Sequence, residues 1–166
     1  MAKIGIFYGS STGNTELIAG KLRELFAGNA EMVNIDAAGK EDIEKYEYLI
    51  FGTSTWGIGD AQDDWDDFME VLGDISFTNK KVALFGLGDQ FNYPYAFVDG
   101  MGVIYDAIYD KADIVGAWPV EGYTFNESAA VKQGKFVGLA IDKENQQHLT
   151  DERLKKWVEI LKKEFV

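Results

Sequence analysis

The segment GSSTGNT, residues 9–15, gathers hydroxyl side chains and two glycines in one short loop. It follows the apolar run KIGIF and leads into LIAGKLRELF, whose apolar residues have helical spacing. Backbone N–H groups at such a helix N-terminus attract an anion, and the hydroxyls of Ser10, Thr12 and Thr15 can add donors. The loop lacks the lysine of a nucleotide triphosphate motif and the spacing of a dinucleotide fingerprint. It therefore favours a phosphate monoester held without a countercharge, the alternative being a loop whose hydroxyls only cap the helix.

The rest of the sequence alternates between strand-like and helix-like segments. Apolar runs predict strands at 2–8, 31–35, 46–53 and 80–88 and a fifth beginning at 113, with a further apolar run at 136–141. Helical spacing predicts helices at 14–27, 64–73, 96–111 and 151–165, the last with Thr150 as a candidate N-cap. This alternation indicates a parallel sheet covered on both faces.

Three loops follow the carboxyl ends of the predicted strands. They are GSSTGNT, TSTWGIGDA at 53–61 and GLGDQFNYP at 86–94. In such sheets ligands bind beyond these ends, where the strand order reverses. The three loops are therefore expected to form one site.

Composition limits the classes of function. The chain has 166 residues with 46% hydrophobic content, which predicts one domain spanning residues 1–166. It has no cysteine and a single histidine, His148, which excludes disulfides, thiol catalysis, iron–sulfur clusters and most zinc sites. No apolar run reaches membrane-spanning length and no secretory leader is recognised, so we expect a soluble, cytoplasmic protein. Any redox chemistry would need a bound group.

Negative charge is concentrated in the middle of the chain. The net charge is −12, which argues against nucleic acid or an anionic membrane as a partner. Residues 46–110 contain twelve acidic side chains against only Lys80 and Lys81. The excess of acidic residues in 46–110 either reflects a generally acidic protein or marks a docking surface.

Together, GSSTGNTE, STWGIGDAQDDW and FGLGDQFNYPYAF resemble the flavodoxins, a family of small FMN-binding electron carriers, and the similarity runs the whole chain. The stretch EGYTFNESAAVKQGKFVGLAIDKENQ resembles the insertion that splits the last strand in long-chain members. The resemblance implies an α/β flavodoxin-like three-layer sandwich. Its five-stranded parallel sheet would have the order 2-1-3-4-5 with helices on both faces, and the insertion would lie at 119–136.

The same resemblance implies the residues that hold FMN. The loop from Ser10 to Thr15 would wrap the phosphate, and Trp56 and Tyr93 would sandwich the isoalloxazine ring instead of packing in the core. Gly57 stands where the family's carbonyl flips toward the flavin N5. Ser54 stands where a proline is common and Ala96 where an asparagine is common. The implied ligand set is Ser10, Ser11, Thr12, Gly13, Asn14, Thr15, Thr53, Ser54, Thr55, Trp56, Gly57, Ile58, Gly59, Gly88, Asp89, Gln90, Asn92 and Tyr93. By contrast, Trp65, Trp118 and Trp157 are expected to be core residues.

The implied function is that of a low-potential carrier that shuttles between semiquinone and hydroquinone, monomeric and without a substrate of its own. Its implied partners are an NADPH-dependent flavodoxin/ferredoxin reductase and ferredoxin-type acceptors. Carboxylates near the loop that carries Trp56 are expected to steer basic patches of these partners toward the flavin. They are Asp60, Asp63, Asp64, Asp66, Asp67 and Glu70.

Two other classes stay open from the residues alone. A flavin-dependent quinone or nitro reductase of related fold would need a substrate pocket over the ring and usually binds NAD(P)H. A signalling receiver would need clustered acidic residues after the first strand, where this chain has Tyr8, Gly9 and Ser10, and a phosphatase of this topology would need a cysteine.

Overall fold

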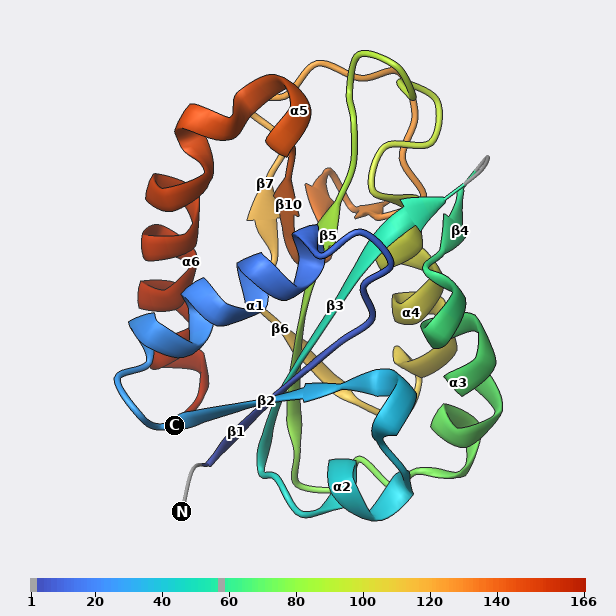
Figure 1. Cartoon of the computed structure of the whole chain (residues 1–166), viewed down its shortest axis with the longest axis vertical. Coiled ribbons are helices and arrows are strands. Elements are labelled where there is room, and N and C mark those ends of the chain that lie inside the picture. The colour runs from blue at the N-terminus through green and yellow to red at the C-terminus, as the bar shows by residue number, and fades with distance from the viewer. Residues whose placement is uncertain (1–2, 57–58) are drawn as a thin grey trace.

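A twisted parallel sheet forms the middle layer of the molecule in the computed structural model, which describes residues 3–56 and 59–166 (Figure 1). Its strands are β1 (Ile4–Tyr8), β2 (Ala30–Asn34), β3 (Tyr48–Trp56), β5 (Lys81–Leu87), β6 (Asp113–Val115) and β10 (Leu139–Ile141), with β4 (Asp60–Ala61) antiparallel to the end of β3. The order is β10-β5-β3-β1-β2, and β6 also pairs with β5. This is the predicted order 2-1-3-4-5, and the carboxyl ends of the central strands meet at one edge.

The fifth strand is divided, as the long-chain resemblance implied. β6 pairs with Lys81–Ala83 and β10 with Phe85–Leu87, so both lie along the same edge of β5. The interruption spans residues 116–138, slightly more than the expected 119–136. It contains a small antiparallel sheet of β7 (Trp118–Pro119), β9 (Lys135–Phe136) and β8 (Val131–Lys132).

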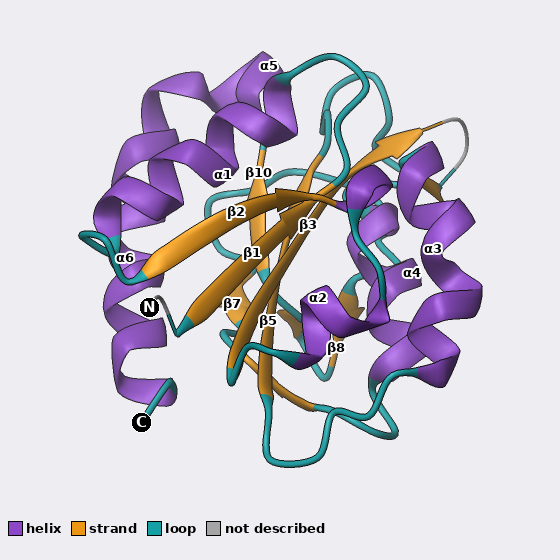
Figure 2. Ribbon diagram, turned by 60° about the horizontal axis from the view of Figure 1, so that its bottom comes forward, coloured by secondary structure: helices purple, strands orange, loops and turns teal. Residues whose placement is uncertain are grey.

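Helices cover both faces of the sheet (Figure 2). α1 (Asn14–Leu25) and α6 (Thr150–Glu164) pack together on one face, and α3 (Asp63–Asp74) and α4 (Asp99–Ile108) pack together on the other. The shorter helices are α2 (Lys40–Glu44), α5 (Lys143–Gln146) and the 3₁₀ turns Ile35–Ala37 and Gln147–Leu149. No helix in the described ranges is long and apolar enough to cross a bilayer.

The three tryptophans expected in the core are buried. Trp65 Nε1 donates to the Gly52 carbonyl at 2.7 Å, and Trp157 Nε1 donates to the Gly116 carbonyl at 2.8 Å. Each indole therefore contributes apolar area without leaving its N–H unpaired. The prediction that Thr150 caps the last helix is wrong, because α6 already includes Thr150 and its N-cap is Leu149. The buried Thr150 hydroxyl has no hydrogen-bond partner in the described part of the chain.

Candidate functional site

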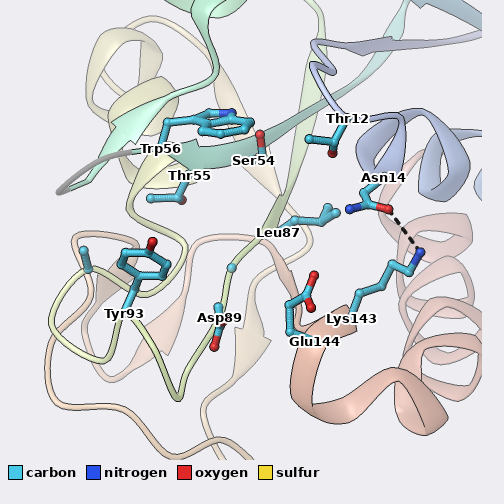
Figure 3. Close-up of a pocket in the computed structure, with 12 residues that line it drawn as sticks. Thr12, Asn14, Ser54, Thr55, Trp56, Leu87, Asp89, Tyr93, Lys143 and Glu144 are labelled. Carbon is cyan, nitrogen blue, oxygen red and sulfur yellow. Dashed lines mark hydrogen bonds between the residues drawn. The ribbon is translucent and has the colours of Figure 1, made fainter.

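A cavity of about 260 Å³ lies where the three predicted loops meet (Figure 3). The residues that line it come from those loops, from the segment just after the third loop and from α5: Thr12, Asn14, Ser54, Thr55, Trp56, Leu87, Gly88, Asp89, Tyr93, Ala96, Lys143 and Glu144. Figure 3 shows the aromatic rings of Trp56 and Tyr93 toward one end and Thr12, Asn14 and Lys143 toward the other. The cavity thus has an aromatic end and a polar end.

The polar end is built at the start of α1. Gly13 is the N-cap in a left-handed conformation, with φ of 89°, which glycine adopts without a side-chain penalty. The Ser10 hydroxyl accepts the Gly13 N–H at 2.9 Å, and Thr15 is buried. Of the three hydroxyls expected to offer donors, only that of Thr12 belongs to a residue lining the cavity. Contacts of Ser10 and Thr15 with a phosphate stay a prediction.

Gln62 fixes this loop to the second loop, and sequence analysis did not identify it. Its buried side chain donates from Nε2 to the Ser11 hydroxyl and to Asp64 Oδ2, both at 3.0 Å. Its backbone N–H donates to the Thr53 hydroxyl at 3.1 Å. Thr53, predicted as a ligand, is fully buried and does not line the cavity, so its role is to hold the loops together.

The second loop supplies one unpaired hydroxyl to the cavity. Ser54 Oγ is buried and has no hydrogen-bond partner among the described residues, whereas the Thr55 hydroxyl accepts the Gly100 N–H at 2.9 Å. A buried hydroxyl without a partner is costly unless something else meets it. Ser54 lines the cavity, so a bound polar ligand can supply the missing partner.

Trp56 and Tyr93 are surface residues, as their loop positions predicted. Trp56 is 41% exposed and Tyr93 56% exposed, and both line the cavity. Large aromatic faces left open beside a pocket are suited to stacking on a flat ligand. Ala96, which replaces a polar side chain common in the resembling family, also lines the cavity and offers it only a methyl group.

Asp89 brings a negative charge to the cavity. Its carboxylate accepts the backbone N–H groups of Phe91 at 3.1 Å and Asn92 at 2.9 Å, and the side-chain amides of Asn92 and Asn145, each at 2.8 Å. Burial acts to raise the pKa of Asp89, but these hydrogen bonds outweigh it and hold the pKa below its ordinary value of 3.8. The group is therefore ionised at neutral pH.

The loop that carries Tyr93 is anchored from behind by Asp142, which is 1% exposed. This carboxylate accepts Gln90 N at 3.0 Å, Gln90 Nε2 at 2.8 Å, Asn145 N at 3.0 Å and Asn145 Nδ2 at 2.9 Å. Gln90 Nε2 also donates to Gln146 Oε1 at 2.9 Å, and Arg153 donates to the same oxygen at 2.8 Å. Gln90 was predicted to meet the flavin through its backbone, and that contact stays a prediction; its side chain belongs to this network.

The interruption of the fifth strand supports the same loop. Asn126 N and Glu127 N donate to the Pro94 carbonyl at 2.7 and 3.0 Å, and Ala129 N donates to Asp99 Oδ1 at 2.6 Å. Burial raises the pKa of Asp99, partly offset by the Ala129 N–H, and Glu127 raises it further. Residues 94–99 are therefore held by residues 126–129.

The remaining predicted ligands divide into three groups. Gly88 lines the cavity, as expected. Ser11, Gly13, Gly59 and Asn92 do not line it; Gly59 has φ of 106° and approaches Asp99, and Asn92 donates to Asp89. Gly57 and Ile58 lie outside the described residues.

Lys143 and Glu144 also line the cavity, although neither was predicted as a ligand. They lie more than a hundred residues from the first loop in sequence, so no local pattern indicated them.

The carboxylates expected to dock partners lie on and before α3. Asp60, Asp63, Asp66, Asp67 and Glu70 are exposed. Asp64 is only partly exposed and receives the Gln62 amide, so it belongs to the framework of the phosphate loop as much as to the surface.

Comparison with known proteins gives consistent matches. Residues 6–157 match the family model for flavodoxin. The flavodoxin of Synechococcus elongatus is 46% identical over 168 residues, covering 99% of both chains, and that of Synechocystis is 47% identical over 165 residues, covering 98% of this chain and 97% of that one. A crystal structure of Fusobacterium nucleatum flavodoxin bound to flavin mononucleotide is 37% identical, covers 99% of both chains and superposes with a TM-score of 0.93.

Proposed function

This chain belongs to the flavodoxin family and is an FMN electron carrier, and we propose that it works at low potential as a one-electron shuttle without a substrate of its own. The observation that carries the proposal is the cavity with two open aromatic faces at one end and an N–H-rich helix start at the other. This arrangement matches a flat ring joined to a phosphate.

The residues present fit FMN. Trp56 and Tyr93 would contact the ring, and the loop 10–15 with the start of α1 would hold the phosphate. The orphaned Ser54 hydroxyl would gain a partner in the polar part of the cofactor. When bound, FMN supplies electron transfer in single steps through its isoalloxazine ring.

Fixed charges of the protein support a low potential. Asp89 lines the cavity and is ionised at neutral pH, and Glu144 lines it as well. Each negative charge opposes the addition of an electron nearby. At an effective dielectric constant of about 20, a carboxylate roughly 12 Å away contributes ~1.4 kcal/mol, equivalent to ~60 mV for one electron. Screening by salt makes several such contributions less than additive.

The first prediction tests the function directly. Apoprotein titrated with FMN should bind one equivalent per chain, and FAD should bind more weakly because no described residue of the cavity is arranged for an adenylate half. Visible absorbance during dithionite reduction then reports single-electron steps. Absence of flavin binding would overturn the proposal, and steady-state NADPH oxidation by the purified protein alone would favour the reductase alternative.

Docking is proposed to occur at the acidic surface made by Asp60, Asp63, Asp66, Asp67 and Glu70. Asp60 pairs with Trp56 across β3 and β4, Asp63 begins α3, and the other three follow along this helix. The acidic surface therefore starts next to the aromatic end of the cavity and continues along α3. A cluster of one sign attracts a basic partner over long range and raises the association rate more than the final affinity. The partners of matching chemistry are basic reductases that use NADPH and acceptors of the ferredoxin type.

The second prediction concerns this surface. Neutralising Asp63, Asp66, Asp67 and Glu70 to the corresponding amides should flatten the dependence of electron-transfer rate on salt, because long-range attraction is screened within about 10 Å at 0.1 M. Asp64 is left unchanged since it supports Gln62. Stopped-flow rates with a basic reductase measure the slope, and FMN affinity should stay within about twofold.

A matched control changes the charge equally at the opposite edge of the sheet. Glu41, Glu47, Asp110 and Asp113 are exposed and lie at the amino ends of the strands, away from the cavity. Their amide variants should keep most of the wild-type salt slope. Equal slopes in the two variants would show that only net charge matters and would contradict a docking role for α3.

A further inference from the structure

We propose that Lys143 provides the positive charge for the phosphate end of the cavity and thereby selects the phosphorylated flavin over riboflavin. This inference rests on the proposed binding of FMN and identifies a further binding residue. The sequence of the loop predicted a phosphate held without a countercharge. The structure brings a countercharge from α5, a different part of the chain.

The position of the Lys143 ammonium carries the inference. Lys143 is the first residue of α5, and its Nζ lies 3.1 Å from Oδ1 of Asn14, the first residue of α1. Both side chains line the cavity, and Figure 3 shows them together at its polar end. The ammonium therefore lies beside the helix start whose free N–H groups already favour an anion.

The ammonium has bonding capacity left. A lysine has three N–H donors, and Asn14 Oδ1 accepts one of them. Within residues 3–56 and 59–166, Lys143 forms no salt bridge with a carboxylate. Among the described residues that line the cavity, Lys143 is also the one cationic side chain, alongside the carboxylates Asp89 and Glu144. Its charge is thus available to a ligand, and it compensates part of the negative charge that would repel a phosphate.

A purely structural role makes a different prediction. If Lys143 only fastened α5 to α1 through Asn14, its removal would loosen the cavity for any flavin. Riboflavin has the same ring and ribityl chain as FMN but no phosphate. If Lys143 acts as a countercharge, its removal raises the Kd for FMN alone. If it only holds α5 against α1, its removal raises the Kd for both ligands equally.

The third prediction compares the two ligands. Lys143→Gln should raise the Kd for FMN about fivefold to tenfold at low salt, because a partly exposed charge-assisted contact is lost, and should leave the Kd for riboflavin within about twofold. Quenching of flavin fluorescence on titration of the apoprotein measures both constants. The FMN effect should shrink as ionic strength rises. Lys143→Arg should keep most of the preference for FMN, and Glu144→Gln should strengthen it.

Lys163→Gln is the matched control, because Lys163 is exposed near the end of α6 and does not line the cavity. It should leave both constants unchanged. Equal losses for FMN and riboflavin in Lys143→Gln would assign Lys143 to fastening and overturn the inference, as would an unchanged Kd for FMN. Wild-type apoprotein that binds no FMN would instead overturn the proposed function, a result that the wild-type titration alone reveals.

Discussion

Replacing Asp142 with alanine should lower the free energy of unfolding of the apoprotein by about 3 kcal/mol and weaken FMN binding as well. The carboxylate does not line the cavity, yet it accepts four hydrogen bonds from Gln90 and Asn145. Alanine would leave the backbone N–H groups of Gln90 and Asn145 without partners, whereas their side-chain amides keep Gln146 and Asp89. Each buried group left unpaired costs about 1–3 kcal/mol before relaxation. Urea denaturation and FMN titration measure the two effects.

A surface carboxylate provides the control for Asp142. Asp113 is exposed at the start of β6, so Asp113→Ala should change stability by less than about 0.5 kcal/mol. In Asp142→Ala the loop 88–95 should lose order first, since Gln90 anchors it. An unaltered FMN affinity in this variant would show that the loop keeps its position without the buried carboxylate.

Removal of the two open aromatic rings should give the largest loss of FMN affinity. Trp56→Ala and Tyr93→Ala should each weaken binding by about 2 kcal/mol, or about 30-fold, through lost stacking and lost apolar contact. The stability of the apoprotein should hardly change, because both rings are already exposed. Titration of apoprotein with FMN, together with urea denaturation, separates these two quantities.

Phe91 offers a control from the same loop. It is 80% exposed and does not line the cavity, so Phe91→Ala should leave FMN affinity within about twofold. A large loss of apoprotein stability in Trp56→Ala or Tyr93→Ala would place those rings in the framework of the fold instead of in the ligand site.

The parallel sheet and the position of the site could be predicted from local patterns, whereas the strand order was implied by the resemblance to flavodoxins. Strands buried on two faces appear as continuous apolar runs, such as the one that forms β3, and loops that follow them must meet at one edge. Trp56 and Tyr93 could be separated from the buried Trp65 because their neighbours are polar and glycine-rich.

The parts that could not be predicted depend on contacts between distant segments. Lys143 reaches Asn14 across 129 residues, and Asp142 meets Gln90 across 52. A loop pattern shows which residues are near a site but not which way each side chain turns. The fully buried Thr53 was therefore included among the ligands although its hydroxyl joins two loops, and the side chain of Gln90 is held by Asp142 while its backbone contact with the flavin stays a prediction.

The register of β6 and β10 along β5 shows how little of the sheet the segment between them occupies. Val115 lies opposite Ala83 and Leu139 opposite Phe85, so the whole segment 116–138 takes the place of one residue opposite Leu84. In the pairing along β5 this segment therefore occupies the space of a single residue.

The segment also supports the cavity, because residues 126–129 form hydrogen bonds with the segment 94–99, which follows Tyr93. The same segment also belongs to the core, because Trp118 and Phe136 are buried and the Gly116 carbonyl accepts the indole N–H of Trp157. Deleting it is therefore expected to lower the stability of the fold and to remove the support of residues 94–99 together.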